Sequence, residues 1–174
     1  QPDLNFHNVE VQKAVLAETR FWLERGVDGV RLDTANYYFC DRELRSNPPR
    51  EPIEQNTFSS VNPYGRQYHI HDKSQPENVV FMQKLRSLLN EYNAISIGEV
   101  GDEDRSLETM AIYSAGGDKL HMCYTFDLLG KQFDPSLFAG KVGGFVEACP
   151  EGWPCWAFSN HDVERHATRW AGRS

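Results

Sequence analysis

The chain has 174 residues, of which 40% are hydrophobic and 12% aromatic, so it can bury the core of one globular domain. A net charge of -7 without a basic run argues against nucleic acid or an anionic membrane as a partner, and favours a small neutral substrate. No apolar stretch approaches the ~20 residues that span a bilayer, and no secretory signal is visible, although the chain begins at Gln1. We expect a cytoplasmic protein, with periplasmic and secreted locations as open alternatives.

The first predicted elements are a helix and a strand. Residues 8–26 read as a helix with Asn8 as its N-cap and Gly26 as its stop, and a strand over 27–33 follows at once. Residues 37–73 are rich in proline and lack periodicity, which predicts a long inserted loop. Loops of this length are uncommon unless they are functional, so we expect this one to form a wall or lid over a site.

The rest of the chain alternates helices and strands. Ser74 and Glu77 predict a capping box, with Pro76 in the first turn of a helix. The stretch AISIGEV then predicts a strand that ends at Glu99, a helix over about 104–114 stops at Gly116-Gly117, and KLHMCYTFD predicts the next strand. A helix over 135–147 begins after the N-cap residue Asp134, and CWAFSNHD predicts a strand ending near Asp162. This alternation predicts an α/β fold with a parallel sheet.

The cysteines and histidines do not predict a metal site. The four cysteines lack the C-x-x-C or histidine spacing of a zinc centre, and His69-x-His71 is better explained as part of the long loop, so no metal ligands are assigned. Cys149 and Cys155 flank PEGWP and could close a small disulfide loop, although reduced thiols are the favoured alternative.

Two opposite charges stand in the strand GVDGVRLD. Because strand side chains alternate between faces, Arg31 and Asp33 project to one side and Leu32 to the other. A guanidinium beside the carboxylate keeps Asp33 ionised and fixes its orientation. An isolated R-x-D is more often a structural ion pair, so the remaining carboxylates must decide its meaning.

Three predicted strands end in a carboxylate, namely Asp33, Glu99 and Asp162. Their spacing fits repeated units of about 30 residues with residues 37–73 inserted in one unit, so all three are expected at the carboxyl rim of a (β/α)8 arrangement. Two carboxylates across a polyhydroxylated substrate are what glycoside hydrolysis needs. With no cation adjacent in sequence, the pKa of Glu99 can rise as a general acid requires, whereas Asp33 stays ionised as a nucleophile.

These residues carry a resemblance. GVDGVRLD, ISIGEV and FSNHD resemble three short blocks of the α-amylase superfamily (glycoside hydrolase family 13), in order and at suitable spacing, and QPDLN is similar to a fourth. The resemblance implies a retaining enzyme with Asp33 as the nucleophile, Glu99 as the acid and base, and Asp162 as a ligand of the sugar 2- and 3-hydroxyls. It also implies that Arg31, His161 and Arg165 line the same pocket.

Within that family, NPYGRQYHIHDKSQPEN and GGDKLHMCYTFDLLG are similar to bacterial exo-acting α-glucosidases. Members that prefer α-1,4 links tend to carry Thr or Ala after the nucleophile, so Thr34 suggests short α-1,4-linked substrates. The resemblance requires no cofactor for the chemistry and leaves structural calcium in a complete enzyme open. A transglycosylase or a sucrose- or isomaltose-active relative is the first alternative function, and a non-catalytic barrel relative that acts as an interaction module is the second.

The chain departs from the family in its extent. A (β/α)8 barrel needs eight strands, and residues 1–174 supply about strands four to seven as a single segment of it. Such a piece would leave two unpaired sheet edges and an open core. We therefore expect that the remainder of the barrel is needed from the same or another chain, and that the piece alone is inactive.

Overall fold

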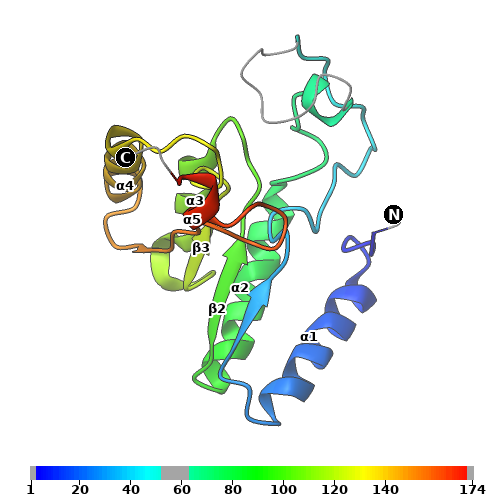
Figure 1. The fold of residues 1–174 in the computed structure, drawn as a ribbon. Coiled ribbons are helices and arrows are strands. Elements are labelled where there is room, and N and C mark those ends of the chain that lie inside the picture. The colour runs from blue at the N-terminus through cyan, green and yellow to red at the C-terminus, as the bar shows by residue number, and fades with distance from the viewer. Residues whose placement is uncertain (1–2, 52–62, 172–174) are drawn as a thin grey trace.

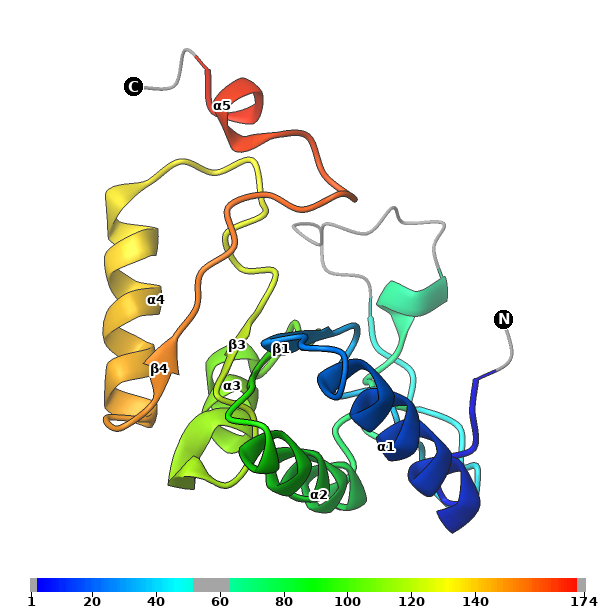
Figure 2. The same cartoon turned by 90° about the horizontal axis from the view of Figure 1, so that it is seen from below.

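The computed structural model describes residues 3–51 and 63–171. These residues form a parallel sheet with strand order β1-β2-β3-β4, and the four longer helices lie on one side of it, whereas the short last helix lies apart from them (Figure 1, Figure 2). The strands are β1 (Gly29–Leu32), β2 (Ile95–Glu99), β3 (Met122–Tyr124) and β4 (Trp153–Pro154). The helices are α1 (Val9–Leu23), α2 (Pro76–Glu91), α3 (Ser106–Ser114), α4 (Pro135–Ala148) and α5 (His166–Arg169), with 3-10 turns η1 (Pro63–Arg66) and η2 (Ala115–Gly117).

Two of the predicted helix starts are confirmed. The side chain of Asn8 accepts the amide of Glu10 at 3.0 Å, and that of Asp134 accepts the amide of Ser136 at 2.8 Å. Each satisfies a backbone donor that the first turn leaves unpaired. Gly26 follows α1 with a φ of 88°, a left-handed conformation that glycine adopts without steric cost.

The predicted capping box at Ser74 is wrong. The N-cap residue of α2 is Gln75, and Ser74 lies before it with a φ of 55°. The Ser74 hydroxyl instead accepts a hydrogen bond from the side-chain amide of Asn36 at 2.9 Å, and the Glu77 carboxylate pairs with Arg42. Tertiary partners have thus replaced the local cap that the sequence pattern favours.

The register of the sheet separates a core face from an open face. Arg31 lies opposite Ile97, and Glu99 lies opposite Tyr124, so strand alternation puts all four on the face away from the helices. The other face packs on α2 and α3 to form the core. The side chains packed between the sheet and these helices are at most 5% exposed and include Phe81, Met82, Leu85, Leu89, Val100, Met110, Tyr113, Leu120 and Cys123.

The predicted last strand is in the wrong place. The ladder between β3 and β4 covers only Trp153 and Pro154, so the strand ends before the residues 155–162 that we expected it to contain. Among the described residues β4 has one neighbour, β3, and its backbone beyond Pro154 has no ladder partner. Asp162 therefore lies in an irregular segment well past the strand. Cys149 and Cys155 are both free thiols, as the favoured alternative states.

The long loop leaves and rejoins the sheet at its carboxyl end (Figure 1). Its two ends meet where the Ser74 amide donates to the carbonyl of Asn36 at 2.6 Å. Within it, Pro49 and Gln67 form an antiparallel bridge, and η1 adds one short turn. Residues 52–62 of the predicted loop lie outside the described residues.

Candidate active site

One guanidinium joins two carboxylates at the carboxyl end of the sheet. Arg31 contacts Asp33 through Nη1 and Glu99 through Nη2, and Nη2 also donates to the Tyr124 hydroxyl at 2.9 Å. The shared face that strand alternation predicts for Arg31 and Asp33 agrees with this contact. The hydrogen bond to Tyr124 and, after it, the carboxylates raise the pKa of Arg31, so the cation is permanent.

Glu99 is the buried member of this group. Its side chain is 6% exposed, and its Oε2 also accepts the Tyr124 hydroxyl at 2.8 Å. No cation is adjacent to Glu99 in sequence, but the parallel register brings Arg31 of β1 onto the open face beside it. Burial raises the pKa of Tyr124, so its hydroxyl keeps its proton and remains a donor to Glu99.

Asp33 is the accessible member. Its side chain is 71% exposed and opens on a cavity of about 250 Å³, lined by Asp3, Leu4, Phe6, Asp33, Thr34, Tyr37 and Tyr38. Asp3 and Leu4 thus line the same cavity as the carboxylate that they precede by about 30 positions. Burial, with a smaller contribution from the charge of Asp33, raises the pKa of Tyr38 to about 12, so this wall of the cavity is neutral.

The backbone around Asp33 is held against the strand that carries Glu99. The Ala35 amide donates to the carbonyl of Glu99 at 2.7 Å. The fully buried Asn36 side chain donates to the carbonyl of Gly101 at 2.9 Å and accepts its amide at 3.0 Å. Thr34, at the start of this turn, has a φ of 38°, which is strained for a β-branched residue. The turn after Asp33 is therefore fixed from both sides.

The other predicted site residues are not joined to this group. His161 and Asp162 are 75% and 70% exposed in their side chains, and their own contact is 3.7 Å. Arg165 is exposed at the N-cap of α5. In the described part of the chain, no hydrogen bond or ion pair links these three to Arg31, Asp33 or Glu99. The segment after β4 does extend past β3 toward the side of β1 in both views (Figure 1, Figure 2).

Several residues at the site were missed from sequence. Tyr124 could have been found, because it stands at the end of the strand KLHMCYTFD, beside the predicted end of the Glu99 strand. Asn36, Tyr37 and Tyr38 carry no motif of their own, and only the three-dimensional turn places them.

Neither a metal-binding cluster nor a membrane-spanning helix is found in the part of the chain that the structure describes. No group of three or more His, Cys, Asp or Glu side chains there could hold a metal ion. His69 instead pairs with Asp72 at 2.7 Å and with the carbonyl of Tyr64 at 2.8 Å. Over the same described residues, no helix is long and apolar enough to cross a bilayer.

Comparison with known proteins places the site in a family. The family described as "Alpha amylase, catalytic domain" matches residues 1–174. A probable alpha-glucosidase of Rhizobium meliloti (strain 1021) is 55% identical over 98% of the chain and 32% of its own length. Maltase A2 of Drosophila melanogaster is 30% identical over 97% of the chain and 31% of its own length. A solved alpha-glucosyl transfer enzyme, XgtA, superposes with a TM-score of 0.92 at 50% identity, over 99% of the chain and 32% of that structure.

The chain thus spans about a third of the length of the curated relatives that it matches. Four parallel strands with their helices on one side are the corresponding part of a (β/α)8 barrel, so the predicted fold class is confirmed. The chain belongs to the alpha-amylase catalytic-domain family of glycoside hydrolases.

Proposed function

We propose that residues 1–174 carry the nucleophile and the acid/base of a retaining α-glucosidase that removes terminal glucose from short oligosaccharides. The observation that carries this proposal is the Arg31 guanidinium, which contacts both Asp33 and Glu99. Two carboxylates that contact one guanidinium lie beside each other at one site, which supports a paired-carboxylate mechanism; the retaining outcome is assigned on the family resemblance.

The two environments support two roles. Asp33 is exposed to the cavity and paired with a permanent cation, so it is charged and free to attack the anomeric carbon. As the bond from Asp33 to the anomeric carbon forms, Glu99 in its protonated form gives that proton to the leaving glycosidic oxygen, and the bond between that oxygen and the anomeric carbon breaks. Glu99 then takes a proton from water, whose oxygen displaces Asp33 from the anomeric carbon. The net result is one glycosidic bond hydrolysed and both carboxyl groups restored.

The remaining roles concern the sugar. We assign Asp162 to the 2- and 3-hydroxyls, and His161 and Arg165 to the same pocket, on the resemblance alone. These residues are exposed in the segment after β4, and their roles require this segment to close against the cavity beside Asp33. We further propose that the remaining barrel strands supply that closure, so residues 1–174 expressed alone should not hydrolyse maltose.

We assign the preferred linkage to α-1,4 on the family resemblance of Thr34, the residue after Asp33; Thr34 also lines the cavity into which Asp33 opens. The complete gene product is the protein encoded by the complete reading frame that contains residues 1–174. The experiment measures its hydrolysis of maltose and of isomaltose. We expect maltose to react faster, and Thr34→Val to shift the preference toward isomaltose. Faster cleavage of isomaltose by the unmodified protein, or an unchanged preference in the variant, would contradict the assignment.

Transglycosylation is the second candidate function. It is supported by the 50% identity to a solved alpha-glucosyl transfer enzyme, and it uses the same glycosyl-Asp33 intermediate with a sugar hydroxyl as the acceptor in place of water. Product analysis at high maltose concentration separates the two functions. The leaving group of maltose is released as glucose in both cases, so the comparison concerns the second step, in which the glucosyl group goes to water or to another maltose. Trisaccharide in excess over the glucose formed by transfer to water would favour transglycosylation.

A further inference from the structure

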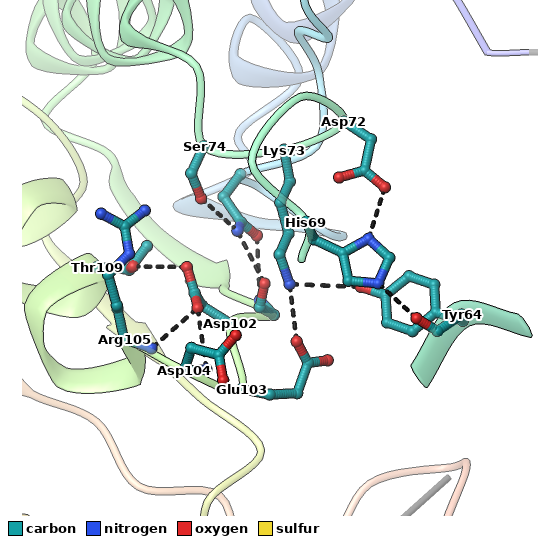
Figure 3. Close-up of polar contacts among 12 residues, drawn as sticks. Tyr64, His69, Asp72, Lys73, Ser74, Asp102, Glu103, Asp104, Arg105 and Thr109 are labelled. Carbon is teal, nitrogen blue, oxygen red and sulfur yellow. Dashed lines mark hydrogen bonds and ion pairs between the residues drawn. The ribbon is translucent and has the colours of Figure 1, made fainter. Parts of the chain in front are cut away.

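A second polar network lies outside the reactive carboxylates, between the long loop and the segment after Glu99. Its centre is Lys73, whose side chain is 2% exposed. The Lys73 ammonium donates to Glu103 Oε2 at 2.8 Å and to the Tyr64 hydroxyl at 3.3 Å (Figure 3). A buried ammonium is unfavourable unless it is paired, so these partners are needed where the lysine lies.

The network ties two segments that are distant in sequence. Lys73 is at the end of the long loop, and Glu103 is four residues after Glu99, in the connection from β2 to α3. A parallel contact joins the same two segments, because Arg50 of the long loop pairs with Asp104 at 2.8 Å. The long loop is thus fastened to the β2–α3 connection, a few residues past Glu99.

Tyr37 connects this network to the cavity beside Asp33. The Tyr37 hydroxyl shares a hydrogen bond of 2.5 Å with the Tyr64 hydroxyl, and the Lys73 ammonium lies 5.5 Å from the centre of the Tyr37 ring. The ring also packs closely on Gly101, since a methyl group added there would come within 3.2 Å of it. Tyr37 also lines the cavity into which Asp33 opens. Its position is therefore set by contacts with Tyr64, Lys73 and the β2–α3 connection.

We propose that Lys73 is a positioning residue that acts through Tyr37, holding this aromatic ring as the wall against which the substrate sugar fits beside Asp33. The inference rests on the proposed glucosidase function and deepens it, because it names a determinant of substrate fit. Lys73 touches neither Asp33 nor Glu99 in the described contacts. Its removal should weaken substrate binding and leave the chemical step largely intact.

The test compares Lys73→Met with the conservative Lys73→Arg in the complete gene product, with maltose as substrate. Lys73→Met should raise KM about tenfold, the cost of losing one well-aligned contact, with kcat within about twofold of the unmodified protein. Lys73→Arg should recover most of the loss. Glu103 is 32% exposed, so water can solvate its carboxylate when the ammonium is gone. Lys84→Met is the matched control, because Lys84 contacts Gln12 between α1 and α2, away from the site.

A double variant tests whether Lys73 acts through the ring. Tyr37→Leu should raise KM by itself, and Lys73→Met/Tyr37→Leu should be no worse than Tyr37→Leu alone. Additive effects, or a Lys73→Met variant that behaves like Lys84→Met, would overturn the inference. If Lys73→Met does not fold, Lys73→Gln, which keeps a polar group but removes the charge, takes its place in the same comparison. An unmodified protein that cleaves no α-glucoside would instead refute the proposed function.

Discussion

Replacing Arg31 by methionine isolates what the guanidinium does for Glu99. The Glu99 side chain is 6% exposed, and its described partners are Arg31 and the Tyr124 hydroxyl. Arg31→Met leaves a buried carboxylate with one neutral donor, and losing a charged partner in such a position costs about 1.5–3 kcal/mol. Asp33 adds little to this cost, because at 71% exposure water solvates it. We expect the free energy of unfolding to fall by about 1.5–3 kcal/mol.

A double-mutant cycle assigns that loss to the Arg31–Glu99 pair. Glu99→Gln removes the charge, so Arg31→Met should be much less harmful in the Glu99→Gln background, with a coupling energy of about 1–2 kcal/mol. Urea unfolding of the complete gene product and the three variants measures it. The control cycle uses Arg42 and Glu77, a 3.3 Å pair with side chains 65% and 39% exposed, for which about 0–1 kcal/mol is expected. A coupling energy no larger than that of the control would refute the argument.

Three further predictions use other parts of the structure. Gly98→Ala should lower the free energy of unfolding by about 1–3 kcal/mol, because the new methyl group would lie 2.4 Å from the buried Leu120 side chain. Gly143→Ala is the control, since its methyl group would meet no atom within 4 Å and the variant should be neutral or stabilising in the same thermal or urea unfolding. Hydrogen bonds from Arg45 lower the pKa of Asp41, so its contribution to stability is present above the unfolded pKa and is lost as the pH falls through the folded one. Urea midpoints should therefore favour the unmodified protein over Asp41→Asn at pH 5–7, and the gap should shrink progressively as the pH falls below about 4; a gap that stays constant down to about pH 2 would contradict the linkage.

The sequence predicts most of the elements because their signals are local. Asparagine and aspartate caps, a stop glycine and apolar periodicity place α1, β2 and α4 close to where the structure has them. The errors arise where a tertiary partner decides. Ser74 is drawn away from a cap by Asn36, and the last strand stops at Pro154 because it lacks a ladder partner beyond that residue.

The candidate site likewise has parts that local sequence signals predict and parts that depend on tertiary partners. Arg31 and Asp33 could be paired from strand alternation alone. The contact of Arg31 with Glu99 depends on the register between β1 and β2, and the place of Tyr124 depends on the register between β2 and β3; neither register is a property of one segment. The environment of Glu99 could not be predicted for this reason, since its cation comes from the neighbouring strand.

The most direct test of the central claim traps the glycosyl-enzyme intermediate. An α-glucoside with an activated leaving group needs no acid to form the intermediate, but without the Glu99 carboxylate its breakdown by water is slow. Incubating the Glu99→Gln variant of the complete gene product with 2,4-dinitrophenyl α-glucoside should therefore add one hexosyl group to the peptide that contains Asp33, as peptide mass spectrometry would detect, and Asp33→Asn/Glu99→Gln should remain unlabelled. No label, or a label on another residue, would contradict the assignment of Asp33 as the nucleophile.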